Sequence, residues 1–295
     1  MIRSKSLGSR VFDVINYLIL SLLALTCLYP LWYTFCVSIS TKSAASAGLV
    51  TFYPIGFSVS SYIQIINDRL FFNSFWISIQ RTVLGTAVTM LVTVLAAYPL
   101  SKTNRDFKAR DVFMWIFIFC MIFNGGLIPW YLTMQAYHLI DTIWALVLGG
   151  GLPVFNVILV MNFFRNLPKD LEEAAVVDGA GPWRILFQIF VPCSVPALAT
   201  VVLFISVYHW NEFFNGLVLM NSANKYPLQT YIQQLVINIQ TSTTMTPEQY
   251  KRLSQLSNQS LNAAKVFIAL IPMLIVYPFL QKYFVNGIML GAVKE

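Results

Sequence analysis

The stretch from Val14 to Thr41 is VINYLILSLLALTCLYPLWYTFCVSIST and contains no charged side chain. A helix needs about 20 predominantly apolar residues to cross the hydrocarbon core of a bilayer, so this stretch is long enough to span a membrane. It is too long for a signal-peptide core and lacks a small-residue cleavage site, so we expect it to be retained as a helix. Windows with at most one charge recur at residues 70–101, 112–140, 142–164, 185–211 and 253–281.

The composition of the whole chain agrees with these windows. Of its 295 residues, 57% are hydrophobic and 11% are charged, and the mean hydropathy is +0.68. A soluble domain has roughly 25% charged residues and already exposes much apolar surface, so its interior cannot hold this many apolar side chains. The composition therefore excludes an ordinary soluble enzyme, a disordered chain and a nucleic-acid-binding protein.

The apolar windows predict an all-α membrane protein with six transmembrane helices. Strands that span a bilayer would show alternation over about ten residues, and none is visible. We expect one transmembrane domain over residues 14–285, between a cytoplasmic N-terminus (1–13) and a cytoplasmic C-terminus (286–295). The predicted spans are residues 14–39, 72–100, 112–136, 142–164, 194–220 and 262–284.

The distribution of Lys and Arg predicts the orientation. With six spans, twelve of these residues lie on the side that holds both termini, and five lie on the other side. Cytoplasmic loops carry the excess of positive charge, so we expect a multi-pass protein of the bacterial cell (inner) membrane with both termini in the cytoplasm. On the outer side, Thr246-Pro247-Glu248 predicts a short helix at about 247–257, with Thr as the N-cap.

The segment between the fourth and fifth predicted spans, residues 165–193, has a pattern of its own. Pro168 is placed to open a helix, and the acidic residues that follow suit the positive end of the helix dipole. Gly179-Ala180-Gly181 breaks this helix, and Pro182 starts a second short one. We predict a cytoplasmic helix–turn–helix whose small residues let a partner approach closely and whose carboxylates pair with the partner's Arg or Lys. Its apolar stripe is Leu167, Leu171, Ala174 and Ala175, and its acidic residues are Asp170, Glu172 and Glu173.

Three features of this segment are similar to a known motif: Glu173-Ala174-Ala175, Asp178-Gly179-Ala180, and the Ile189-Phe-Val-Pro192 ending. Together they resemble the EAA loop of binding-protein-dependent ABC importer permeases, whose usual ending is Ile-x-Leu-Pro. The resemblance implies a cytoplasmic coupling helix between the fourth and fifth spans that docks on an ATP-binding subunit. The residues implied in this coupling are Glu172, Glu173, Ala174, Ala175, Asp178, Gly179 and Ala180.

Other parts of the chain resemble the carbohydrate importers of this family. Trp210-Asn211-Glu212-Phe213 is similar to their Trp-Asn-x-Phe motif, and Phe123–Pro129 with the end of the chain from Gly287 is similar to permeases that import oligosaccharides from complex polysaccharides. The resemblance implies a heterodimer with a second permease subunit, two ATP-binding subunits that hold ATP and Mg, and an extracytoplasmic solute-binding protein that delivers the sugar. It leaves open which sugar is carried, and the same architecture could carry an amino acid or a peptide.

Polar side chains inside the predicted spans are candidates for the substrate path. Arg81 and Glu212 each lie about eight residues from the outer end of a span, or about 12 Å deep, so we expect them to pair or to border the path. His209 has no Cys or carboxylate at metal-ligand spacing, so we interpret it as a packing residue and expect no metal site. The other candidates are Asn124, Asn156, Asn162, Tyr208, Trp210, Asn211 and Asn215.

Other classes of membrane protein have sequence motifs that this chain lacks. No phosphate-binding Gly-x4-Gly-Lys-Ser/Thr loop is present, so we expect no ATP hydrolysis and no cofactor in this chain. The spans contain no paired carboxylates and no nucleophile–base pair, which disfavours a membrane enzyme and leaves no catalytic residue to name. The sequence shows no repeated halves, which disfavours a secondary transporter.

Overall fold

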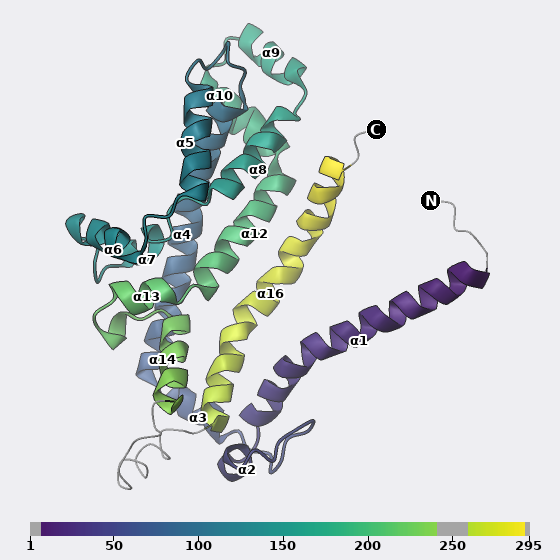
Figure 1. Ribbon diagram of the computed structural model, residues 1–295, viewed down its shortest axis with the longest axis vertical. Helices are drawn as coiled ribbons and strands as arrows, with labels where there is room; N and C mark the ends of the chain where they lie inside the picture. Colours follow the sequence, from purple (N-terminus) through teal and green to yellow (C-terminus); the bar gives the residue numbers. More distant parts are fainter. Residues whose placement is uncertain (1–6, 241–258, 293–295) are drawn as a thin grey trace. The chain divides into compact units, whose positions relative to one another are not determined.

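The computed structural model describes residues 7–240 and 259–292, and every regular element among them is a helix (Figure 1). These residues form two compact units, of which the first combines residues 7–69 with 234–240 and 259–270 and the second combines 70–233 with 271–292. The helix predicted at 247–257 lies outside the described residues.

The first unit contains α1 (Leu7–Ser38), α2 (Lys42–Ser46), α3 (Ser60–Ile66) and the first turns of α16 (Gln259–Ala292). The most apolar window of α1 is 0% buried within the protein. A helix this apolar and this exposed needs lipid or another apolar surface around it, as a membrane span does.

Buried polar contacts attach α16 to α1 and α3 inside this unit. The Ser260 hydroxyl donates to the Ser40 carbonyl at 3.0 Å and lies 2.8 Å from the Ser61 hydroxyl. The ammonium of Lys265 lies 2.6 Å from the carboxylate of Asp68. Lys265 is one of the two cations inside the predicted spans, and this pairing compensates its charge.

The second unit contains the other helices as far as the first turns of α14, together with α16 from Ile271 onward. It begins with its longest helix, α4 (Arg69–Ser101). The elements that follow are α5 (Arg110–Ile122), α6 (Leu127–Ala136), α7 (Ile143–Leu148), α8 (Val154–Arg165), α9 (Lys169–Val177), α10 (Pro182–Ile185), the π-helical turn η1 (Leu186–Phe190), α11 (Val191–Cys193), α12 (Val195–Asn211), α13 (Phe214–Leu219), η2 (Ala223–Lys225) and α14 (Leu228–Gln240). Helices α9 and α10 lie at the same end of this unit, and α13 lies toward its other end (Figure 1).

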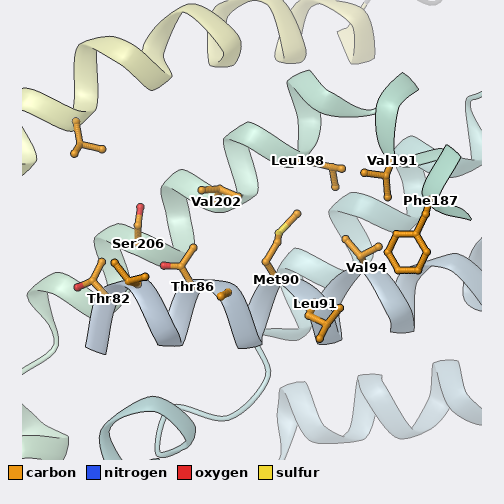
Figure 2. A pocket seen from close by; sticks show the side chains of 13 residues that line it. Thr82, Thr86, Met90, Leu91, Val94, Phe187, Val191, Leu198, Val202 and Ser206 are labelled. Atoms are coloured by element: carbon orange, nitrogen blue, oxygen red, sulfur yellow. The ribbon is translucent and has the colours of Figure 1, made fainter. Parts of the chain in front are cut away.

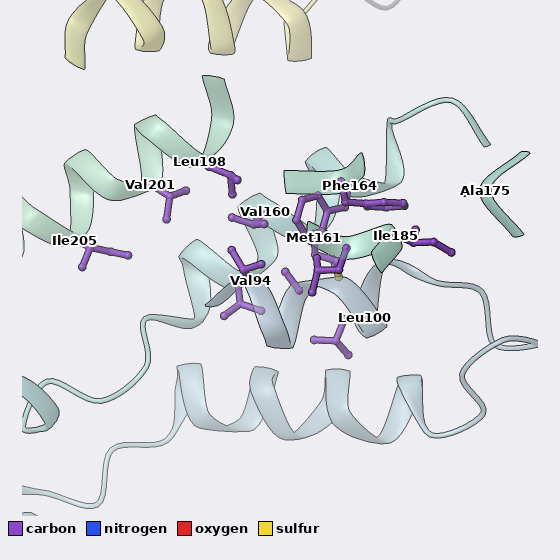
Figure 3. Packing of buried hydrophobic residues seen from close by; sticks show 14 residues of the cluster. Val94, Leu100, Val160, Met161, Phe164, Ala175, Ile185, Leu198, Val201 and Ile205 are labelled. Atoms are coloured by element: carbon purple, nitrogen blue, oxygen red, sulfur yellow. The ribbon is translucent and has the colours of Figure 1, made fainter. Parts of the chain in front are cut away.

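The core of the second unit joins α4, α8, α9, α10 with η1, and α12. Figure 3 shows side chains from these elements converging, with Val94 and Leu100 from α4 close to Val160 and Phe164 from α8. Ala175, from α9, is part of the same cluster. Burial of these side chains is the main force that holds α9 against the rest of the unit.

Within residues 7–240 and 259–292, three helices are long and apolar enough to cross a membrane by themselves: Gly8–Ser38, Arg69–Ser101 and Gln259–Val276. Two further spans are formed if each of two bent helix pairs crosses as one. The fourth predicted span is represented by the shorter apolar helix Val154–Arg165.

The prediction of one continuous helix over residues 112–136 was wrong. Helices α5 and α6 meet at an angle of 118°. The residues between them include Asn124-Gly125-Gly126, and Gly126 has φ +86° with its N–H bonded to the Asn124 side chain at 2.9 Å. This local hydrogen bond and the left-handed glycine favour a turn over a helix.

The fourth and fifth predicted spans are also interrupted. In 142–164, α7 ends at Leu148 and α8 begins at Val154, and Gly151 between them has φ +65°. In 194–220, α12 ends at Asn211 and α13 begins at Phe214, while the segment before α12 meets it at 84°. Apolar windows therefore indicate which segments are apolar enough for a membrane but do not show where each helix stops.

Candidate coupling and translocation site

Helix α9 and a glycine turn occupy the predicted helix–turn–helix segment. Gly179 has φ +76°, a backbone conformation that glycine adopts without steric cost. The N–H of Ala180 bonds to the Ala175 carbonyl at 2.9 Å, which closes the end of α9. Helix α10 then begins at Pro182. The helix, the turn and the second helix all lie where the sequence predicts them.

The two faces of α9 differ in exposure. Ala175 is 8% exposed and packs into the core, whereas Glu173 and Ala174 are exposed and Val177 is 86% exposed. Of the predicted apolar stripe, Ala175 is buried and Leu167 is partly buried against the same core, whereas Leu171 is 43% exposed. The outer face of α9 presents a carboxylate next to small and apolar side chains.

Glu172 is directed toward its own chain. Its carboxylate lies 2.5 Å from the ammonium of Lys102, which follows α4. The same ammonium lies 4.3 Å from the ring centroids of both Tyr98 and Phe190. Glu172 is thus held by an internal cation, while Glu173 is the exposed neighbour that remains available to a partner.

The predicted pairing of Arg81 with Glu212 is confirmed. Arg81 is fully buried, and its guanidinium forms an ion pair with the Glu212 carboxylate and donates to the Glu212 backbone carbonyl at 2.6 Å. The other carboxylate oxygen accepts the N–H of Asn215 at 2.8 Å. Because Glu212 lies between α12 and α13, this set of contacts fixes the break between the two helices.

Glycines allow aromatic and polar side chains to pack closely around this break. A Cβ added at Gly85 would lie 2.6 Å from the His209 ring, and one added at Gly150 would lie 2.4 Å from the Tyr208 hydroxyl. The His209 ring also lies 3.4 Å from the Thr89 hydroxyl. These contacts agree with a packing role for His209 between α4 and α12.

The predicted path residues do not form one continuous surface. Arg81, Glu212, His209 and Asn215 surround the α12–α13 break. The buried residues of the set also include Asn156 and Trp210, and the exposed ones are Asn124, Asn162, Tyr208 and Asn211.

A separate groove of about 620 Å³ runs along α4 and α12 (Figure 2). Its accessible lining is almost entirely apolar, because the hydroxyl oxygens of Thr82 and Thr86 are buried and the Ser206 hydroxyl donates to the Leu203 carbonyl at 3.0 Å. The Thr82 and Thr86 hydroxyls have no hydrogen-bond partner within the described residues. The predicted path residues do not line this groove; those that do are Thr82, Val83, Thr86, Ala87, Met90, Leu91, Val94, Phe187, Val191, Leu198, Val202, Ser206 and Val276.

The sequence carries a weak signal for this groove. Thr82, Thr86 and Met90 recur every four residues on α4, and Leu198, Val202 and Ser206 do the same on α12. Residues four apart lie on one face of a helix, so each set forms a stripe. These stripes were not singled out from the sequence, because Ser and Thr are common in apolar helices, whereas charged and amide side chains are rare there.

The comparison with protein families decides the identity. Residues 2–289 match the model of the family described as binding-protein-dependent transport system inner membrane component. The chain belongs to this family. This permease is therefore a multi-pass inner-membrane subunit of an ABC importer that depends on a binding protein, and it is a transport subunit and not an enzyme.

Individual relatives agree with the family assignment. The permease is 36% identical to the polygalacturonan/rhamnogalacturonan transport system permease protein YtcP of Bacillus subtilis, over 97% of this chain and 99% of that protein. It is 25% identical to the maltodextrin transport system permease protein MdxG of the same organism, over 95% and 96% of the two chains.

Solved structures support the fold. A chain in the crystal structure of a bacterial ABC transporter involved in the import of the acidic polysaccharide alginate matches with a TM-score of 0.85 and 34% identity, covering 95% of this permease and 99% of that chain. A second chain, from an alginate transporter in complex with its periplasmic protein, matches at 14% identity with a TM-score of 0.53, which shows the fold alone.

Proposed function

We propose that this permease imports oligosaccharides derived from complex, acidic polysaccharides. An extracytoplasmic solute-binding protein delivers the sugar, a second permease subunit completes the path, and two ATP-binding subunits hold ATP and Mg on the cytoplasmic side. Two of the relatives above 30% identity are named for such substrates, one for polygalacturonan and rhamnogalacturonan and one for alginate, and these names support the substrate class.

In this proposal the membrane domain has six spans with both termini in the cytoplasm. The three long helices and the two bent pairs supply five, and the α7–α8 segment supplies the sixth. Twelve of the Lys and Arg residues then lie on the cytoplasmic side.

Helix α9 is the coupling helix of the proposal, and one observation carries this assignment. It is anchored by buried Ala175 while Glu173 and Ala174 remain exposed on a short helix closed by Gly179. Such a helix can enter a cleft of an ATP-binding subunit and move the core to which it is attached. Glu173, Ala174 and Asp178 would contact the ATPase, whereas Ala175, Gly179 and Ala180 would keep the helix in place.

The substrate path of the proposal combines the groove on α4 and α12 with the polar residues at the α12–α13 break. The apolar wall of the groove can pack against sugar ring faces. Of the candidates named from sequence that lie at the break, Tyr208 and Asn211 are exposed and can contact a sugar. Arg81 is paired and buried, so its role in the proposal is to hold the helix break.

The test is transport by the reconstituted complex with Glu173→Lys and Gly179→Asp. Both variants should insert normally and retain ATP hydrolysis, but the uptake of labelled uronic-acid oligosaccharides should fall at least tenfold. Asp13→Lys is the matched control, because it makes a comparable charge change on an exposed residue of α1, and it should transport normally. Normal uptake by the Glu173 and Gly179 variants would contradict coupling through α9. Uptake of a labelled amino acid or peptide in place of the sugar would contradict the substrate class.

A further inference from the structure

The cytoplasmic end of α4 is a junction at which several elements meet. The Leu100 carbonyl accepts a hydrogen bond from Arg110, at the start of α5, and another from Arg165, at the end of α8, both at 3.1 Å. The last carbonyls of a helix carry the negative end of its dipole, which explains why cations collect there. Through these contacts α5 and α8 are fixed to the end of α4.

Lys102 adds α9 to this junction. Its ammonium lies 2.5 Å from Glu172 and 4.3 Å from each of the ring centroids of Tyr98 and Phe190. The side chain is only 15% exposed, so the carboxylate and the two rings replace most of its water. A cation held by a carboxylate and two aromatic faces has a defined position, unlike a solvated surface lysine.

No other side chain of α9 forms an ion pair with a different element in the part of the chain that the structure describes. The apolar attachment of α9 is the packing of Ala175 on the core, with Leu167 and Ala180 partly buried against the same cluster at its two ends. Apolar packing is non-directional, so it does not by itself fix the direction in which a short helix moves. The Lys102–Glu172 pair therefore supplies the directional link between α9 and α4.

We propose that Lys102 is a positioning residue that transmits the displacement of α9 to α4. The inference rests on the proposed function, in which ATP-binding subunits move α9. Lys102 directly follows α4 and lies 21 residues after Arg81, or about 32 Å along the helix axis at 1.5 Å per residue. A shift of the cytoplasmic end of α4 would thus reach the Arg81–Glu212 contact and the break between α12 and α13. Without Lys102, α9 could move while α4 stays in place.

The test compares Lys102→Met with Lys102→Arg in the complex reconstituted with its binding protein. Methionine removes the charge but keeps an unbranched side chain, so the number of sugars imported per ATP hydrolysed should fall about tenfold, which corresponds to about 1.4 kcal/mol of coupling. ATP hydrolysis stimulated by the loaded binding protein should stay within about twofold of wild type. Arginine keeps the charge and stacks on aromatic rings, so Lys102→Arg should restore import per ATP to within about twofold.

Two further variants complete the test. Glu172→Gln should lower import per ATP by the same factor as Lys102→Met, and the double variant should be no worse than either single one, because all three remove the same contact. Lys108→Met is the matched control; Lys108 is an exposed lysine of the same loop, and its loss should leave import per ATP unchanged.

The outcomes separate the possible failures. Unchanged import per ATP in Lys102→Met, or additive losses in the double variant, would overturn the role of Lys102. A proportional loss of assembled complex, hydrolysis and import would assign Lys102 a merely structural role and also overturn the proposal. If the wild-type complex hydrolyses ATP but imports no sugar, it is the proposed function that fails.

Discussion

The guanidinium of Arg81 is buried with a single carboxylate beside it, and this sets the energetics of substitutions at both positions. Removing one partner of a buried pair leaves an uncompensated charge, whereas removing both leaves none. The side chain of Arg81 is 0% exposed and that of Glu212 is 12% exposed, so neither charge can be fully hydrated after its partner is lost.

We expect Arg81→Ala to lower the stability of the folded protein by about 3–5 kcal/mol. The double variant Arg81→Ala with Glu212→Ala should lose less than the sum of the two single variants, because the buried charges disappear together. Thermal unfolding of the four proteins in detergent would measure this cycle. Strictly additive losses would contradict a direct energetic link between the two side chains.

The pairing of Arg81 and Glu212 was predictable because charges are rare in membrane spans and both lie at the same depth. The contact between His209 and Gly85 was not, since it depends on which face of α4 meets which face of α12. The ion pair of Glu172 with Lys102 of the same chain was not predicted, for the same reason. A carboxylate on an exposed loop suggests an external partner, and Lys102, 70 residues earlier, gives no local sign of being that partner.

At the scale of elements, the turn after α9 depends on one of two neighbouring glycines. Gly179 has φ +76°, whereas Gly181 has φ −74°, and a Cβ would meet nothing within 4 Å at either position. Backbone conformation alone therefore distinguishes the two.

We expect Gly179→Ala to lower stability by about 1–2 kcal/mol, the approximate cost of the left-handed conformation for a residue with a Cβ. Gly181→Ala should lower it by much less, which makes it the matched control. Unfolding of both variants in detergent, beside the wild type, would measure the difference. Equal losses would mean that the turn does not require the positive φ of Gly179.

A second connection between elements should depend on pH. The ammonium of Lys225 and the N–H of Asn221 hold the pKa of the Asp141 carboxyl below its ordinary value of 3.8. The folded state therefore binds this proton less readily than the unfolded state, so the contact stabilises the protein above about pH 4. This contribution is lost as the pH falls through the lowered pKa.

The expected result is that wild type and Asp141→Asn differ in stability by a constant amount between about pH 7 and 5, and that the difference shrinks below about pH 4. Thermal unfolding across this range would measure it. A difference that grows toward low pH would contradict the direction of the pKa shift.

The helical membrane character of the chain was predictable to a greater extent than the shapes of its helices. Charge-free windows follow from composition, and a bilayer requires them wherever the chain crosses. The interruptions at Gly126, Gly151 and Glu212 arise from left-handed glycines and from a side chain that bonds across helices. A hydropathy window averages over many residues, so a single glycine or carboxylate that interrupts a helix does not change it enough to be detected. The glycines could nevertheless have been read from the sequence as possible break points.

At the scale of the whole molecule, the proposed six spans predict on which side of the membrane each loop lies. In a variant without its four native cysteines, Arg105→Cys and Lys169→Cys should both be protected from a membrane-impermeant maleimide added to intact cells. Lys225→Cys should be labelled. If α7 and α8 do not together cross the membrane, Arg105→Cys and Lys169→Cys would lie on opposite sides, and one of them would be labelled.

The π-helical turn at Leu186–Phe190 also has a consequence for changes in chain length. Such a turn accommodates one residue more than an α-helical turn. Deleting a single residue there would convert the wide turn into an ordinary one, and every later side chain would keep its direction. The same deletion within α12 would rotate all following side chains by about 100° and turn Glu212 away from Arg81. This short turn is therefore a point where the chain can be shortened by one position without disturbing its alignment downstream.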